Sequence, residues 1–159
     1  MKIKLICVGK LKEKYLTQAV NEYSKRLSRY CKLEIVELKD EKVPEKLSDA
    51  QRKQAVAAEG ERILKHLDPH SAVVTLEIRG KELTSETFAE KIQNLCLSGT
   101  STITFIIGGS LGLAPAVLEK STWRLSFSPM TFPHQLFRVM LLEQIYRAFK
   151  INNHETYHK

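Results

Sequence analysis

Strand-like and helix-like segments alternate from one end of this chain to the other, joined by short links. The strand patterns cover residues 2–8, 31–38, 72–78, 101–107 and 123–127, and the helix patterns cover residues 11–30, 48–67, 85–97, 114–120 and 133–150. Strands separated by helices pair in parallel, and the helices then cover the sheet. The alternation therefore predicts an α/β fold, a mostly parallel sheet with helices on both faces. Because no repeat or long linker divides the sequence, a single domain is expected over residues 1–159.

Residues with strong local preferences mark the ends of these segments. Ser48 is suited to begin a helix, and Pro69 ends it because proline cannot continue the helical hydrogen-bond pattern. The Arg-Gly-Lys sequence at residues 79–81 predicts a turn after a strand, and Gly99 predicts the stop of the helix before it. Pro133 is expected to open the last helix.

The composition excludes several classes of protein. Hydrophobic residues make up 43% of the chain, which argues against disorder, and no apolar run reaches the ~18 residues that a membrane span needs. The apolar stretch near the N-terminus is too short for an export signal. Cys7, Cys31 and Cys96 show neither paired nor metal-ligand spacing, so each is expected in the core. The chain is therefore expected in the reducing cytoplasm.

Positive charge is concentrated in two parts of the chain. The net charge is +7 overall, with +5 in residues 1–42, −1 in residues 43–100 and +3 in residues 101–159. Two basic thirds indicate a polyanionic partner such as nucleic acid, and a solvated basic surface is the alternative. The same two readings apply to one basic face, formed by Lys10, Lys12, Lys14, Lys25, Arg26 and Arg29.

Ligands of open α/β sheets bind beyond the C-terminal ends of the strands, and one such end is rich in glycine. After the strand at residues 101–107 the chain reads Gly108-Gly109-Ser110-Leu111-Gly112. This spacing matches neither the G-x-G-x-x-G dinucleotide pattern nor a phosphate-binding P-loop. Glycine at this point lets a ligand approach the backbone closely, and a tight strand–helix turn is the alternative.

A second strand end carries an unusually apolar loop. Residues 127–133 contain two Phe, two Pro and one Met, whereas exposed connections are normally polar. Such a loop suits the binding of a flat aromatic group such as adenine. A loop folded over the core is the alternative.

The helix predicted from Pro133 to Lys150 is apolar on nearly every side. An amphipathic helix buries one face, so this helix must bury two. One face is expected to cover the sheet and the other to contact a second copy of the chain, which predicts a homodimer. A fully central helix is the alternative. Arg138 and Arg147 interrupt the apolar surface and are candidates for contact with an anion or ligand.

The end of the chain contains the pattern of a zinc protease. His154-Glu155-Thr156-Tyr157-His158 matches H-E-x-x-H. Zinc chemistry needs both histidines on a rigid helix and a third ligand, and this position offers neither. No metal site is therefore expected, although a zinc hydrolase stays as one alternative function.

Four stretches of the chain together resemble the RlmH family, bacterial methyltransferases of the SPOUT class that act on large-subunit ribosomal RNA. They are Val8-Gly9-Lys10-Leu11-Lys12, Ile107-Gly108-Gly109-Ser110-x-Gly112, the segment from Leu125 to Gln135, and Tyr157-His158-Lys159. The resemblance covers the whole chain, and its Met130–Gln135 part is highly specific.

The resemblance implies both a fold and an activity. The fold is a SPOUT domain with a C-terminal trefoil knot. The activity is S-adenosylmethionine-dependent methylation of N3 of a pseudouridine, in the stem-loop of 23S rRNA that contains pseudouridine 1915. The family acts on assembled ribosomes as a homodimer and needs no metal. A non-catalytic RNA-binding factor is the alternative that keeps the fold and the charge.

The resemblance also implies a role for individual residues. The cofactor is expected against Leu76, Gly108, Phe127, Ser128, Pro129, Met130, Thr131 and Phe132. Tyr157 and His158 are expected beside the target base, with Arg147 on the side that faces the RNA. His158 is a candidate general base because histidine titrates near neutrality, and a purely orienting role is the alternative. One departure is His154, where the family has a small residue such as glycine.

Overall fold

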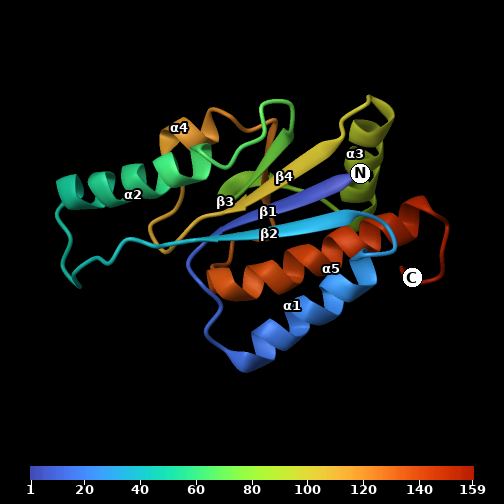
Figure 1. Cartoon of the computed structure of the whole chain (residues 1–159), viewed down its shortest axis with the longest axis horizontal. Helices are drawn as coiled ribbons and strands as arrows, with labels where there is room; N and C mark the ends of the chain where they lie inside the picture. Colours follow the sequence, from blue (N-terminus) through green and yellow to red (C-terminus); the bar gives the residue numbers. More distant parts are fainter.

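The computed structural model describes residues 1–159 as one sheet with helices on both faces (Figure 1). The strands are β1 (Lys2–Val8), β2 (Lys32–Leu38), β3 (Ala72–Glu82), β4 (Thr102–Ile107) and β5 (Trp123–Ser126). The helices are α1 (Lys14–Leu27), α2 (Asp49–Leu64), α3 (Ser85–Leu97), α4 (Pro115–Leu118) and α5 (His134–Asn152). The predicted α/β class is confirmed, and the predicted elements differ from the observed ones mainly at their ends.

The five strands lie in the order β2-β1-β4-β3-β5, and every neighbouring pair is parallel. The β1 strand therefore lies between β2 and β4, although α1 to α3 and two further strands separate it from β4 along the chain. Because all strands run the same way, the segments that follow β4 and β5 emerge at the edge of the sheet where β3 passes Leu76.

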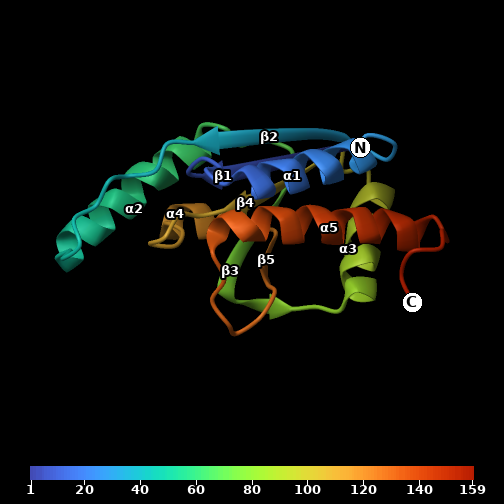
Figure 2. The ribbon, with the colours of Figure 1, turned by 90° about the horizontal axis from the view of Figure 1, so that it is seen from below.

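Alternating side chains divide the core into two layers. On β1, Ile3, Leu5 and Cys7 pack with α1, α3 and α5, whereas Ile6 and Val8 pack with α2 and α4. This alternation follows from the period of two residues in a strand. Figure 1 shows α2 and α4 on one side of the sheet and α1 and α5 on the other, and Figure 2 shows α1 and α5 lying side by side.

The α2 helix begins as its sequence predicts. The Ser48 side chain accepts a hydrogen bond from the Gln51 backbone N–H, and the Gln51 side chain accepts one from the Ser48 backbone, which forms a capping box. Later in the helix, Gly60 lies so close to α4 that a Cβ on it would be 2.6 Å from the Cβ of Ala114. Gly60 therefore permits α2 and α4 to pack directly against each other.

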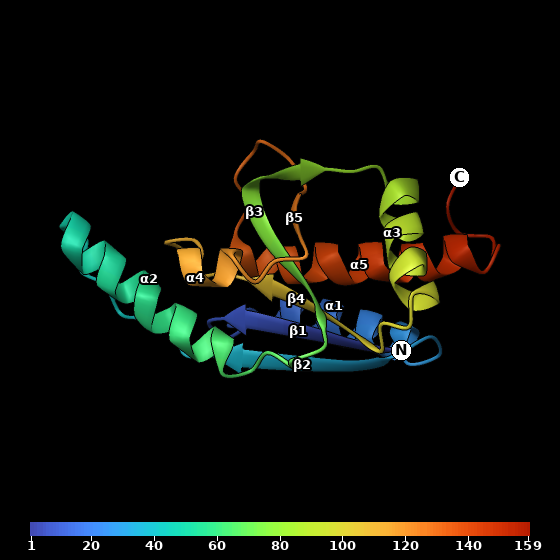
Figure 3. The same cartoon turned by 90° about the horizontal axis from the view of Figure 1, so that it is seen from above.

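The predicted turn at residues 79–81 is wrong, because β3 continues through it to Glu82. The strand pairs with β5 twice, and its register shifts between Leu76 and Lys81. A Cβ on Gly80 would lie 2.6 Å from the carbonyl carbon of Leu125 and 2.8 Å from that of Arg124. Glycine is therefore needed at this position because the two backbones lie so close together, and not because the chain turns. Figure 3 shows the resulting bend of β3 over β5.

The α5 helix covers the sheet between α1 and α3 (Figure 2). Its most buried apolar residues are Leu141, Leu142, Ile145 and Ala148, which join the larger core layer. Val139 and Met140, on another side of the helix, stay only half-buried. The expected covering of the sheet is confirmed, and the second apolar face remains accessible in the single chain.

Arg138 is not the ligand-binding residue that its place on this helix suggested. Its side chain is 1% exposed. Its guanidinium lies 2.7 Å from a carboxylate oxygen of Glu37 and donates a 2.6 Å hydrogen bond to the carbonyl oxygen of Gly9. Arg138 therefore joins α5 to β2 and to the end of β1, and its role is structural.

The expected burial of all three cysteines is wrong for one of them. Cys7 and Cys31 are buried, and burial raises the pKa of Cys7 to about 12 and that of Cys31 to about 11. Cys96 is exposed near the end of α3. Of its apolar sequence neighbours, Leu95 packs against the core but Leu97 is itself exposed, so apolar neighbours in the sequence did not indicate burial.

The chain reverses after α5 in a Schellman motif. The Glu155 N–H donates to the Lys150 carbonyl and the His154 N–H to the Ile151 carbonyl. His154 itself adopts a φ of 55°, the only positive φ at a non-glycine residue. Because the helix ends at Asn152, His154 and His158 do not share a helix, as a zinc site of the H-E-x-x-H type would require.

Replacing His154 with glycine is expected to raise the free energy of unfolding by about 0.5–1 kcal/mol. A side chain in the left-handed region costs about 1–2 kcal/mol, and part of this gain is lost because glycine is more flexible when unfolded. Urea unfolding monitored by circular dichroism measures the change. His154→Ala, which keeps the strain, serves as the control; equal stability of the glycine and alanine variants would contradict this account.

Candidate functional site

A cavity of about 970 Å³ opens beside the middle of β3 and beyond the ends of β4 and β5. It is lined by residues 76–79 of β3, by residues 107–113 at the end of β4 and by most of residues 125–134 at the end of β5. Of the residues expected to hold a cofactor, all line this cavity except Pro129. Three segments that are distant in the sequence therefore form one hollow.

Aromatic rings form one wall of this cavity. Phe137, in the first turns of α5, has its ring centre 5.6 Å from that of Phe127 and 5.7 Å from that of Phe132. Sequence reasoning missed Phe137 because its apolar neighbours on α5 are core residues. Together the three rings offer an apolar surface of the kind that binds a flat heterocycle.

The glycine-rich turn forms the opposite side. Gly112 has a φ of +85°, and its N–H donates to the carbonyl oxygen of Gly109 at 3.1 Å. A Cβ on Gly108 would lie 2.9 Å from the Leu113 side chain, and one on Gly109 would lie 3.2 Å from the buried carboxylate of Glu59. The turn therefore needs glycine for its own conformation, and it also presents bare backbone to the cavity.

Polar side chains, among them the charged Glu77 and Arg79, line the cavity beside its apolar residues. The loop is shaped by Ser128, whose hydroxyl accepts a hydrogen bond from the Met130 N–H at 3.0 Å and whose carbonyl accepts one from Ser126 at 3.2 Å. Burial, and then the charge of Arg138, lowers the pKa of His134, which keeps this ring neutral at pH 7. A pocket that combines apolar walls with fixed polar groups is typical of a nucleoside-binding site.

The three residues expected to be catalytic lie together with two acids. We call this group, formed by Arg147, Tyr157, His158, Glu143 and Glu86, the tail cluster. The Arg147 guanidinium lies 4.7 Å from the ring centre of Tyr157 and 2.6 Å from the Glu143 carboxylate. The Tyr157 hydroxyl also donates to Glu143, at 3.1 Å. Burial, and then the charge of Glu143, raises the pKa of Tyr157 to about 12, so its hydroxyl keeps its proton.

His158 is held from two sides. Its Nδ1 lies 3.2 Å from Nη1 of Arg147, and its Nε2 lies 2.7 Å from the carboxylate of Glu86. Sequence reasoning missed both acids of the cluster. The i, i+4 spacing of Glu143 and Arg147 is a usable signal for the first, whereas nothing in the sequence connects Glu86 to the tail.

Within one chain the tail cluster and the cavity are separate. Neither Arg147, Tyr157 nor His158 lines the cavity. Along α5, Arg147 is roughly 15 Å from Phe137 in the cavity wall, at 1.5 Å per residue. Figure 2 shows the C-terminus at the end of α5 that is distant from α4.

A smaller hollow of about 420 Å³ lies between these two regions. Its wall includes Leu125, Ser126 and Phe127, which also line the cavity, and Glu143, which belongs to the tail cluster. A continuous series of side chains therefore connects the cavity with the cluster along one side of α5.

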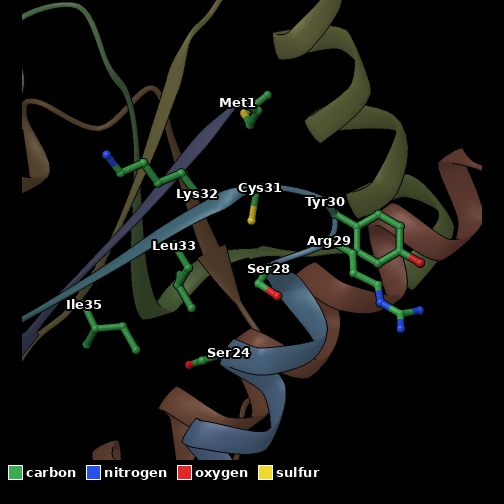
Figure 4. Close-up of a pocket in the computed structure, with 9 residues that line it drawn as sticks. All are labelled: Met1, Ser24, Ser28, Arg29, Tyr30, Cys31, Lys32, Leu33 and Ile35. Carbon is green, nitrogen blue, oxygen red and sulfur yellow. The ribbon is translucent and has the colours of Figure 1, made fainter.

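A third hollow, of about 720 Å³, lies beside the free edge of β2 (Figure 4). The hydroxyls of its two serines are already bonded to α1, because Ser24 donates to the Val20 carbonyl and Ser28 to the Lys25 carbonyl, both at 2.7 Å. It contains none of the residues expected to bind cofactor or substrate. The 970 Å³ cavity is therefore the better candidate for a cofactor site.

The six basic residues expected to form one face are all exposed, but they lie in two groups. Lys10, Lys12 and Lys14 stand before and at the start of α1, where the Lys12 N–H donates to the Gln135 side chain. The other three follow near the end of α1, some 15 Å away along the helix. One group therefore lies close to the cavity and the other close to the tail.

Two further features concern membranes and metals. No helix is both long and apolar enough to span a bilayer. No three side chains of His, Cys, Asp or Glu gather in a way that would hold a metal ion.

Comparisons with known proteins agree with this architecture. A family model described as "Predicted SPOUT methyltransferase" matches residues 1–158. The chain is 64% identical to a "Ribosomal RNA large subunit methyltransferase H" of Bifidobacterium adolescentis and 58% identical to the protein of that name from Clostridium acetobutylicum; each match spans 159 residues and 100% of both chains.

A solved structure shares the fold at low sequence identity. It is described as a probable methylase family protein of Haemophilus influenzae; the TM-score is 0.51 and the identity 15%, and the match covers 96% of this chain and 66% of that one. The likeness supports the fold alone. The full-length family match and the relatives above lead to one assignment: the chain belongs to the SPOUT methyltransferases and, within them, to the ribosomal RNA large subunit methyltransferase H (RlmH) family.

Proposed function

We propose that this chain transfers a methyl group from S-adenosylmethionine to N3 of a pseudouridine in 23S rRNA, in the stem-loop expected from the family, on assembled ribosomes in the cytoplasm. The observation that carries the proposal is the meeting of Leu76, Gly108 and all but one residue of the loop from Phe127 to Phe132 in one cavity, beside β3 and beyond the ends of β4 and β5. Membership of a methyltransferase family supports it.

The cavity residues fit the proposed methyl donor. The rings of Phe127, Phe132 and Phe137 suit the adenine, and the bare backbone of Gly108 and Gly109 permits close approach of the rest of the molecule. S-adenosylmethionine supplies an electrophilic methyl group on a sulfonium sulfur. The work left to the protein is to hold both reactants in line and to exclude water.

The proposed enzyme is a homodimer with a site completed by two chains. The tail cluster lies at the far end of α5 from the cavity of its own chain, so His158 and Tyr157 do not reach that cavity. An antiparallel second copy on the accessible side of α5 would bring its tail to this cavity. The half-buried Val139 and Met140 suit such a contact because they are apolar.

Three residues of the tail cluster have separate tasks in this proposal. Arg147, whose charge is partly balanced by Glu143, stabilises the negative charge that develops on the base when N3 loses its proton. The Tyr157 hydroxyl, which keeps its proton, exchanges its bond to Glu143 for a hydrogen bond that it donates to the base. His158 orients the base or accepts the N3 proton.

The ribosomal RNA is expected to contact the two exposed basic groups near the ends of α1. One group consists of Lys10, Lys12 and Lys14, and the other consists of Lys25, Arg26 and Arg29. Arg26 is paired with Glu22, and the other five have no carboxylate within salt-bridge distance. Unpaired cations bind phosphates and release counterions, so binding should weaken as salt rises.

Incubation of the protein with ribosomes and radiolabelled S-adenosylmethionine tests the function. Ribosomes that lack this methyl group and contain the pseudouridine should gain label in 23S rRNA, and digestion should place it at N3. Free rRNA serves as the comparison for the preference for assembled ribosomes. A chain that binds RNA but neither methylates it nor binds the donor would instead be a non-catalytic RNA-binding factor.

Replacing His158 with alanine should lower the methylation rate about a hundredfold or more, since a positioned acid–base group contributes at least that much. The dissociation constant for the donor should not change, because in this proposal His158 acts on the base, whereas the donor is held by the residues that line the cavity. Single-turnover kinetics and calorimetry measure the two quantities. His70→Ala, at an exposed histidine without side-chain contacts, is the control. An unaltered rate would refute both proposed roles of His158.

A further inference from the structure

The imidazole of His158 has a hydrogen-bond partner on each nitrogen, and the two partners come from different helices. Arg147 is on α5, eleven residues earlier in the chain, and Glu86 is in the first turn of α3, 72 residues earlier. The bond from Nε2 to the Glu86 carboxylate is the shorter, at 2.7 Å, against 3.2 Å for Nδ1 to Arg147.

The Glu86 side chain is ionised, so it can only accept hydrogen bonds. It lies in the first turn of a helix, where its carboxylate accepts from its own backbone N–H and from Thr84. Free N–H groups and the helix dipole favour a negative charge at this position. Its own backbone N–H, then His158 and Thr84, lower the pKa of Glu86 to about 2, so the side chain is ionised throughout the physiological range.

These partners select one form of the ring. A carboxylate only accepts, so the Nε2 that faces Glu86 must carry a proton. A guanidinium only donates, so the Nδ1 that faces Arg147 must carry a lone pair. The ring is therefore neutral, in the Nε2–H form. Other charged or titratable groups near it are Glu143 on α5 and the hydroxyl of Tyr157, both bonded within the cluster.

We propose that Glu86 is a positioning residue of the methyl transfer: it holds the C-terminal tail on α3 and fixes His158 in the Nε2–H form, so that the lone pair on Nδ1 faces the substrate once Arg147, which donates to it in the free chain, turns to the base. This inference rests on the proposed function, since it assigns a task to a residue of the same site. A carboxylate that orients a histidine and selects its tautomer is a recurring device in enzymes.

Nuclear magnetic resonance of protein labelled with ¹⁵N-histidine tests the tautomer without any substrate. In the unaltered chain, the His158 signals should show a protonated Nε2 and an unprotonated Nδ1 at pH 8, with assignment by loss of signal in His158→Ala. In Glu86→Ala they should move to the average of the two tautomers. Glu90→Ala, one turn further along α3 at an exposed residue without side-chain contacts, should leave them unchanged.

Kinetics on the same variants test the link to the reaction. Glu86→Ala should lower the single-turnover methylation rate at least about tenfold, with no change in donor affinity, and Glu86→Gln should recover part of the rate because its amide oxygen can still accept from Nε2. Unchanged His158 signals in Glu86→Ala would overturn the proposal, as would altered signals with an unaltered rate. If the unaltered chain methylates no rRNA, the proposed function fails, whereas the resonances still decide whether Glu86 fixes the ring.

Discussion

A Gly80→Ala variant is expected to lose about 3 kcal/mol of unfolding free energy, at the upper end of what overpacking costs. Its Cβ would lie 2.6–2.8 Å from three backbone atoms of Arg124 and Leu125. Backbone atoms of a paired strand cannot rotate away, so β3 and β5 must separate. The same change should weaken S-adenosylmethionine binding at least about tenfold, because it displaces the Leu125–Phe127 wall of the cavity by a large fraction of an ångström.

Two measurements on this variant separate stability from binding. Urea unfolding gives the loss of stability, and titration calorimetry at low temperature, where the variant stays folded, gives the donor affinity. Lys81→Ala is the matched control, since the neighbouring residue is exposed and its backbone pairing is kept. Wild-type stability in Gly80→Ala would show that β3 does not approach β5 as described.

An Arg138→Met variant should lose about 3 kcal/mol of unfolding free energy. Removing one partner of a buried ion pair costs about 3–5 kcal/mol, and the lower end applies because the Glu37 side chain is still 36% exposed. The variant leaves the Gly9 carbonyl without its 2.6 Å hydrogen bond and leaves Glu37 with only the Leu11 N–H as a donor. The loss combines an uncompensated charge with an unsatisfied carbonyl.

A double-mutant cycle with Glu37→Gln separates the contribution of the ion pair from that of the Gly9 hydrogen bond. If the ion pair accounts for most of it, Arg138→Met should cost at least about 1 kcal/mol less in the Glu37→Gln background. Arg29→Met is the control for loss of a positive charge, because Arg29 is exposed and has no carboxylate partner. Additive effects of the two changes would assign the loss to the Gly9 hydrogen bond instead.

Most of the elements were predictable because their signals are local. The helix from Ser85 to Leu97 was expected with the bounds that the structure has, and Ser48 caps α2 as its side chain predicts. The buried strands 2–8 and 101–107 were recognisable from continuous apolar runs, which both faces of the sheet require. The trefoil knot stays a prediction from the family resemblance.

The cofactor cavity was predictable in part. Gly108 and the loop from Phe127 to Phe132 stood out because a glycine-rich turn and an apolar loop follow strands, and the carboxyl ends of parallel strands meet at one edge. Phe137 gave no such signal, because an apolar residue on an apolar helix has the same pattern whether it lines a cavity or fills the core.

The sequence by itself determined the α/β class, the element bounds to within a few residues, and the glycine-rich turn and apolar loop that together line the cavity. Only the tertiary structure decided the strand order, the approach of Gly80 to β5, the structural role of Arg138 and the contact of Glu86 with His158. The physical reason is the separation of the interacting residues along the sequence. Periodicity and capping depend on residues three or four apart, whereas these contacts join residues 44 to 129 positions apart and exist only once the sheet has placed its helices.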